Sequence, residues 1–123
     1  MLPVSKYKNM KRLDLIIPHE RLQDVNDLLH KHKVGGLTSY DVKGRGAGKK
    51  ESVAVGRGVM RYTPEFASRT KVEVLVSDSQ AKSIIDDILK TISTGSSSDG
   101  KIFVYKVAEA HDIGSKQIGD IAL

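Results

Sequence analysis

The residues best suited to chemistry in this chain lie in two short segments rich in glycine, serine and lysine. The first reads Gly44-Arg45-Gly46-Ala47-Gly48-Lys49-Lys50, and the second reads Ser96-Ser97-Ser98-Asp99-Gly100-Lys101. Glycine lets a ligand approach bare backbone amides, and amides combined with lysine charge suit a phosphate. The first segment is not a Walker A motif, which needs four residues between its glycines and a Lys-Ser/Thr ending. By composition alone, each segment is equally compatible with an ordinary turn.

The chain has 123 residues and a net charge of +5, and most of the excess lies in and after the first segment. Between Lys43 and Lys71 there are eight lysines and arginines but only two glutamates. Such a stretch would attract a phosphate, an acidic protein surface or nucleic acid, or it is simply a solvated basic loop. Nucleic-acid binding is the remote alternative, because stacking needs interleaved aromatic residues and only Tyr62 and Phe66 lie nearby.

Catalysis and metal binding are poorly supported by the sequence. There is no cysteine, which removes disulfides, thiolate zinc sites and thiol catalysis and fits a reducing cytoplasm. His30 and His32 are two residues apart on a predicted helix and so point to different sides, and Asp86 and Asp87 are expected to face solvent. No apolar run is long enough for a membrane span or a signal peptide. We therefore predict a soluble, cytoplasmic protein that is not an enzyme and holds no metal.

Hydrophobic periodicity predicts the order β-α-β, a long loop, then β-α-β. The expected elements are a strand over Lys11–Pro18, a helix over Glu20–His32 closed by Gly35-Gly36, strands over Leu37–Lys43 and Thr70–Ser77, a helix that begins with a capping box at Ser77 and runs to Ile92, and a strand over Lys101–Ala108. This order predicts an α+β, ferredoxin-like split βαβ sandwich with a long loop at about 45–67. Residues 1–9 read as an N-terminal extension. Apolar residues on both faces of the last two strands predict that another copy of the protein covers the open face of the sheet.

Three segments of the chain resemble PII nitrogen-regulatory signal proteins. Met10–Pro18 looks like the opening strand of that family, Gly36–Gly46 is similar to its Gly-Met-Thr-Val-x-x-Val-Lys-Gly-x-Gly segment, and Thr94–Val104 matches its C-terminal signature almost residue for residue. The resemblance covers residues 10–123. It implies a homotrimer that binds ATP or ADP in the clefts between subunits, and a long loop (the T-loop) that contacts a target such as an ammonium transporter or an enzyme of nitrogen metabolism.

The resemblance also assigns individual residues. It implies nucleotide contacts at Thr38, Gly44, Gly46, Ala47, Gly48, Ser98, Asp99, Gly100 and Lys101, with Lys101 as the main charge on the phosphates. It implies a 2-oxoglutarate effector pocket at Gly48, Lys49 and Arg69, and target contacts at Lys50, Arg57 and Tyr62.

Three positions depart from the family pattern. Gly48 stands where the family has the glutamine that helps to hold Mg²⁺ and 2-oxoglutarate, while Asp112 and Gly114 align with two arginines that grip the phosphates. A carboxylate near a triphosphate repels it. These departures favour ADP or AMP over ATP, and they leave open an alternative: a PII-like sensor of AMP, ADP or bicarbonate with no response to 2-oxoglutarate.

Overall fold

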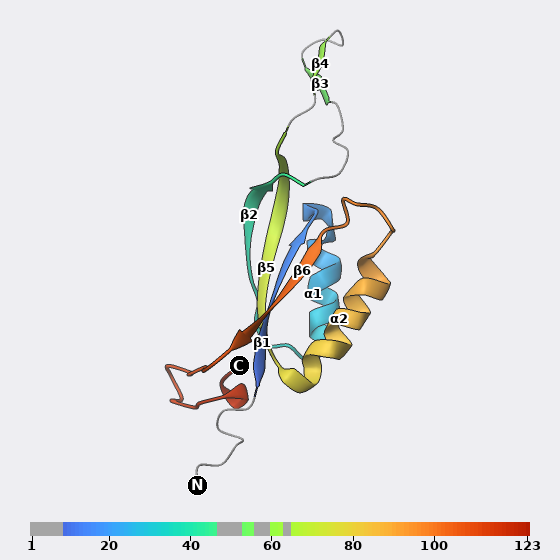
Figure 1. Ribbon diagram of the computed structural model, residues 1–123. Coiled ribbons are helices and arrows are strands. Elements are labelled where there is room, and N and C mark those ends of the chain that lie inside the picture. Colours follow the sequence, from blue (N-terminus) through green and yellow to red (C-terminus); the bar gives the residue numbers. More distant parts are fainter. Residues whose placement is uncertain (1–8, 47–52, 56–59, 63–64) are drawn as a thin grey trace.

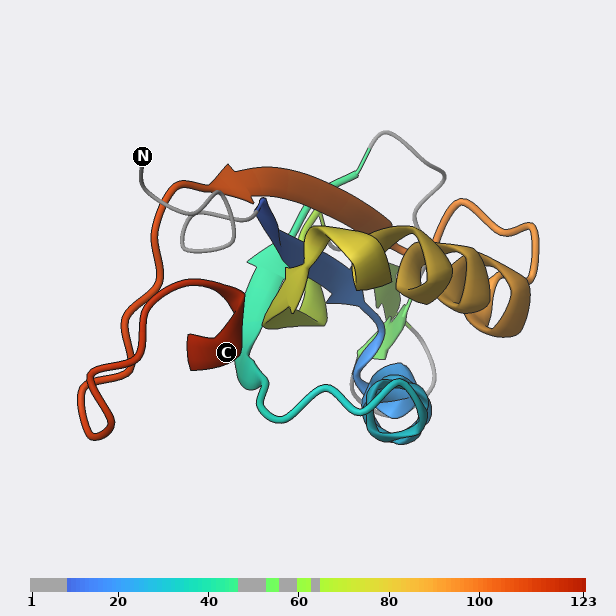
Figure 2. The same cartoon turned by 90° about the horizontal axis from the view of Figure 1, so that it is seen from below.

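The protein is described by a computed structural model that covers residues 9–46, 53–55, 60–62 and 65–123. A four-stranded antiparallel sheet of order β2-β5-β1-β6 carries helices α1 and α2 on one face (Figures 1 and 2). The elements are β1 (Met10–Ile17), the 3-10 turn η2 (His19–Arg21), α1 (Leu22–Lys31), β2 (Thr38–Gly44), β3 (Val53–Val55), β4 (Met60–Tyr62), β5 (Ala67–Ser77), α2 (Asp78–Ile92), β6 (Lys101–Val107) and η3 (Asp120–Ala122). The predicted α+β fold, with two helices on an antiparallel sheet, is confirmed. None of the described helices is long and apolar enough to cross a membrane.

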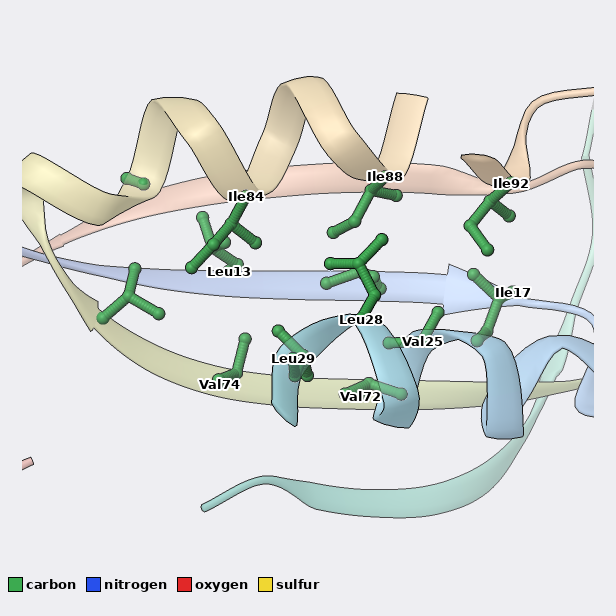
Figure 3. Close-up of a cluster of buried hydrophobic side chains, with 13 residues drawn as sticks. Leu13, Ile17, Val25, Leu28, Leu29, Val72, Val74, Ile84, Ile88 and Ile92 are labelled. Atoms are coloured by element: carbon green, nitrogen blue, oxygen red, sulfur yellow. The ribbon is translucent and has the colours of Figure 1, made fainter. Parts of the chain in front are cut away.

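The core lies between the two helices and the two central strands. On β1 and β5 alternate residues point toward the helices, so that Leu13 lies opposite Val74 and Leu15 lies opposite Val72. Helices α1 and α2 close this layer, with Leu28 and Ile88 pointing toward each other (Figure 3). Each fully buried side chain of this kind contributes about 1.5–3 kcal/mol relative to exposure. The core thereby holds β1 and β5 rigidly in the centre of the sheet.

The helix ends are set by local chemistry. The capping box at Ser77 is confirmed, because the Ser77 N–H donates to Gln80 Oε1 at 3.4 Å. The prediction that Gly35-Gly36 closes α1 is wrong: Lys33 takes the left-handed conformation (φ 61°), and the Val34 N–H donates to the Leu29 carbonyl at 3.0 Å. This is the Schellman pattern, with lysine in the position that glycine usually takes.

The long loop leaves the sheet between two paired strands. Gly44 and Ala67 are the last paired residues of β2 and β5, so the ladder ends there and β5 begins three residues before the predicted strand. Within the loop, β3 and β4 form a separate antiparallel pair that the sequence analysis did not predict. Residues 1–8, most of the predicted N-terminal extension, lie outside the part of the chain that the structure describes.

The face of the sheet opposite the helices is only half covered. It carries four large side chains that are between 41% and 46% exposed, namely Tyr40, Leu75, Phe103 and Tyr105. Between them lies Asp14, which is 1% exposed and forms ion pairs with Arg12 (3.0 Å) and Lys71 (3.6 Å). Its charge is thus compensated inside one chain, while the aromatic and aliphatic groups around it stay accessible to a partner.

Candidate functional site

The serine-rich segment forms the connection between α2 and β6. The carboxylate of Asp99 in this segment forms hydrogen bonds with other residues of the same loop. Asp99 accepts hydrogen bonds from the backbone N–H and the hydroxyl of Thr94, both at 2.6 Å, and from the Ser96 N–H at 3.2 Å. The Thr94 bonds are the largest cause of a pKa of Asp99 below its ordinary value. Asp99 therefore stabilises the loop that presents Ser98 and Gly100, with its side chain directed into that loop.

Gly100 and Lys101 begin β6 against the central strand. Gly100 has φ 118°, and a Cβ at this position would lie 2.1 Å from the Ile16 carbonyl oxygen. Lys101 pairs with Ile16 in the β1–β6 ladder and is exposed. Only glycine allows β6 to approach β1 this closely, so the conformation of Gly100 determines where the Lys101 ammonium is presented.

A cavity of about 250 Å³ lies beside this loop but does not include Lys101. It is lined by Pro18, Glu20, Arg21, Ile92, Thr94, Ser96, Ser98 and Asp99. The Arg21 guanidinium donates to the carbonyl groups of Thr91 and Ile92, both at 3.4 Å, at the C-terminal end of α2. Two carboxylates, of Glu20 and Asp99, line the cavity against the guanidinium of Arg21, which already binds the C-terminal carbonyl groups of α2, so this cavity is poorly suited to a phosphate.

The root of the long loop carries the other group of predicted residues. Thr38 begins β2 and Gly44 ends it, Gly46 follows shortly after, and Arg69 pairs with Val42 across the β2–β5 ladder. A Cβ built on Gly44 would have the Arg69 Cγ at 3.9 Å as its nearest neighbour, so the aliphatic part of Arg69 lies over bare backbone. Directly beyond the ladder, Arg45 Nη1 lies 2.8 Å from Glu65 Oε1. This ion pair joins residues 20 positions apart, and nothing in the sequence pattern indicates it.

The structure separates these two groups of residues. Strands β2 and β6 are the two outer strands of the sheet, three strand-to-strand steps or about 14 Å apart. Lys101 pairs with Ile16, which pairs with Lys71, which in turn pairs with Tyr40 on β2. Gly44 lies four residues beyond Tyr40 along β2. Together these offsets put Gly44 and Lys101 on the order of 19 Å apart in one chain. One chain therefore carries the predicted nucleotide contacts as two half sites, and neither half holds all of them.

Several predicted site residues belong to the long loop. Ala47, Gly48, Lys49, Lys50 and Arg57 lie outside the described residues. Tyr62 lies in β4 opposite Val53, and its side chain is not described. Their assigned roles remain predictions. In the described part of the chain, no group of three or more potential metal ligands comes together.

The C-terminal segment holds Asp112 in a tight hairpin. The Asp112 carboxylate accepts from the Ser115 N–H at 2.8 Å, and this hydrogen bond is the largest cause of a pKa of Asp112 below its ordinary value. His111 and Ile118 form the bridge that closes the hairpin. Asp112 is therefore negatively charged at neutral pH.

The structure is that of a small α+β protein in which the two groups of predicted nucleotide contacts lie at opposite edges of the sheet. The chain belongs to the nitrogen regulatory protein P-II family, whose model matches residues 10–117. It is 35% identical over 114 residues to the nitrogen regulatory protein P-II 1 of Escherichia coli K12, covering 93% of this chain and 100% of that protein. It is 37% identical over 98 residues to the nitrogen regulatory protein P-II of Pasteurella multocida, covering 80% and 86% of the two chains.

Solved structures agree with this family assignment. The Bacillus subtilis GlnK–ATP complex superposes with a TM-score of 0.73 at 26% identity, covering 94% of this chain and 98% of that one. The Arabidopsis thaliana PII structure bound to citrate gives a TM-score of 0.73 at 28% identity, covering 94% of each chain. The family is one of regulators, which confirms the prediction that this protein is not an enzyme.

Proposed function

We propose that the protein is a cytoplasmic PII-type signal-transduction protein that acts as a homotrimer. It binds an adenine nucleotide where the β2 edge of one copy meets the β6 edge of the next. Through its long loop it regulates a target of nitrogen metabolism or ammonium uptake. The similarity to the ATP complex of Bacillus subtilis GlnK supports an adenine nucleotide as the ligand.

The separation of the two half sites is the observation that carries this proposal. Gly44 and Lys101 belong to opposite edges of one sheet, so a second copy that brings its β6 edge to the β2 edge is the simplest way to place both residues against one ligand. In a closed ring, every copy offers its β2 edge to one neighbour and its β6 edge to the other, and all sites become equivalent. The half-exposed Tyr40, Leu75 and Phe103 on the open face supply apolar area that such a ring would bury.

Each edge has a defined part in nucleotide binding. The β6 edge contributes Lys101 as a point charge on the phosphates, positioned by Gly100 and by the loop that Asp99 stabilises. The β2 edge contributes Thr38 and the open backbone at Gly44, with Arg69 beside it. No group of the protein undergoes chemical change, and the ligand acts by favouring one arrangement of the loop root over another.

The charge of Asp112 favours a nucleotide with fewer phosphates. This carboxylate stays ionised because the Ser115 N–H stabilises it, so a phosphate chain that approached the hairpin would meet repulsion. The second candidate function is therefore a PII-like sensor of ADP, AMP or bicarbonate that does not respond to 2-oxoglutarate. Calorimetry with ATP, ADP, AMP and bicarbonate, each with and without 2-oxoglutarate and Mg²⁺, separates the two candidates.

A subunit-mixing experiment tests the divided site. Lys101→Gln removes the charge from the β6 edge, and Gly44→Asp places a carboxylate on the β2 edge, where an added Cβ has room at 3.9 Å from Arg69. Each variant alone should bind no nucleotide. When the two chains are co-expressed in equal amounts and assemble at random, about one quarter of the interfaces join two intact halves and recover binding.

The mixed oligomers are purified through two different tags, and their nucleotide stoichiometry is measured by calorimetry. The two tags remove trimers made of one variant only, and each mixed trimer has one intact interface out of three. Recovery of about one third of the sites therefore supports a site shared between copies. No recovery in mixed oligomers, while the wild-type protein binds, would place the whole site within one chain and overturn the proposal.

A further inference from the structure

A salt bridge closes the root of the long loop just outside the β2–β5 ladder. Arg45 follows Gly44, the last paired residue of β2, and Glu65 lies two residues before Ala67, the first residue of β5. The Arg45 Nη1–Glu65 Oε1 distance is 2.8 Å, and the two side chains are 58% and 57% exposed. The pair joins positions 20 residues apart and extends the connection between β2 and β5 by one step beyond the backbone hydrogen bonds.

Arg45 is next to the open backbone that the proposed function assigns to the ligand. Arg69 lies over Gly44 with its aliphatic part, so two arginines flank this glycine. The anion that Arg45 holds in this structure is the protein's own Glu65 carboxylate. Guanidinium recognises carboxylates and phosphates with the same planar set of donors, so either anion can take this place.

We propose that Arg45 is a further nucleotide-binding residue that contacts the phosphate chain, and that Glu65 is its competitor in the ligand-free protein. This inference rests on the proposed function. An exposed ion pair is weak, whereas a phosphate offers arginine a more highly charged, bidentate partner. A phosphate therefore displaces the exposed Glu65 carboxylate from Arg45. A buried and fully hydrogen-bonded carboxylate would resist such displacement.

The exchange of partners couples ligand binding to the loop root. Once Arg45 contacts a phosphate, the Glu65 carboxylate has lost its partner and lies near a second anion, which repels it. The connection between β2 and β5 then ends at Gly44 and Ala67. Because coupling is reciprocal, whatever favours the salt bridge lowers the affinity for the nucleotide by the same factor.

Calorimetry on the full chain with ATP, ADP, AMP and adenosine tests this role. Glu65→Gln removes the competitor and should tighten ATP binding about threefold, whereas Arg45→Gln removes the donor and should weaken it about tenfold. Both effects should shrink from ATP to AMP and vanish with adenosine. The control is Asp86→Asn, which removes the exposed Lys82–Asp86 pair (2.9 Å) on α2 and should leave every affinity unchanged.

The outcomes separate this inference from the proposed function. If the wild-type protein binds nucleotides and both variants bind them with wild-type affinity, Arg45 is not a binding residue, although the proposed function stands. Equal losses with ATP and adenosine also overturn the inference, because they indicate a structural effect of Arg45 rather than a phosphate contact. If the wild-type protein binds none of the four ligands, the proposed function itself is wrong.

Discussion

Replacing Gly100 by alanine perturbs the point where β6 begins against β1. The added Cβ would lie 2.1 Å from the carbonyl oxygen of Ile16. That oxygen is backbone of the central strand, which pairs with β5 on one side and β6 on the other, so it cannot turn away as a flexible side chain would. The start of β6 would have to move by about 1 Å to reach a relaxed carbon–oxygen separation of about 3.3 Å.

Two costs add up in this variant. A residue with a Cβ at φ 118° is strained, by about 1–2 kcal/mol. Overpacking against a fixed neighbour costs about 1–3 kcal/mol more. Gly100→Ala should therefore lower the free energy of unfolding by about 2–5 kcal/mol, and weaken nucleotide binding through the displaced Lys101.

Two other glycines provide matched controls. Gly95 has φ 83° but nothing within 4 Å of an added Cβ, so Gly95→Ala should cost only the backbone strain of about 1–2 kcal/mol. Gly36 has neither a positive φ nor a close neighbour, so Gly36→Ala should be neutral or stabilise by about 0.4–1 kcal/mol. Urea unfolding followed by circular dichroism ranks the three variants. A Gly100→Ala variant that is no less stable than Gly95→Ala would refute the close approach of β6 to Ile16.

Two further predictions concern assembly and pH. Leu75→Asp on the open face of the sheet (41% exposed) should yield monomers in light scattering, whereas Leu89→Asp on α2 (57% exposed) should leave the oligomer intact; equal behaviour would contradict assembly through the open face. Lys31, and after it His32, lower the pKa of Asp87 to about 2. Since this folded-state pKa is depressed, the stability that Asp87 contributes is present above its ordinary pKa of 3.8 and is lost as the pH falls toward 2. The urea midpoint of Asp87→Asn should therefore fall less than that of the wild type between pH 5 and pH 2. If the two midpoints fall by the same amount, the ionised Asp87 does not contribute to stability in this way.

The fold could be predicted from the sequence because each element buries a single face. On α2, Ala81, Ile84, Ile88 and Ile92 repeat at helical spacing, and all four are buried. The predictions from sequence are wrong where a contact with another element, or a local turn, determines the position of a residue. The sequence predicts that Asp87 faces solvent, but its side chain is only 17% exposed because it binds Lys31, the last residue of α1, and His32, which follows it.

From the sequence, the proposed site is only a set of residues, and the arrangement of these residues depends on strand order. The glycine and lysine residues indicate a phosphate-binding site. Nothing in their spacing shows that Gly44 and Lys101 belong to opposite edges of the sheet. The Arg45–Glu65 pair likewise requires the β2–β5 register, which brings residues 20 apart in sequence next to each other. Asp99 looked like a ligand contact, yet its hydrogen bonds to Thr94 and Ser96 follow from the local path of the loop.

If the site is divided between two sheet edges as proposed, ligand binding and assembly become a single equilibrium. A nucleotide that contacts Gly44 of one copy and Lys101 of the next binds the assembled ring and not the separate chains, so it stabilises the ring by mass action. The same linkage requires that a change far from the ligand, such as Leu75→Asp on the open face, abolish nucleotide binding while every contacting side chain is intact. Lys101→Gln, in contrast, removes the contact and leaves the open face unchanged. Binding and assembly should therefore be lost together in the first variant and be separated in the second.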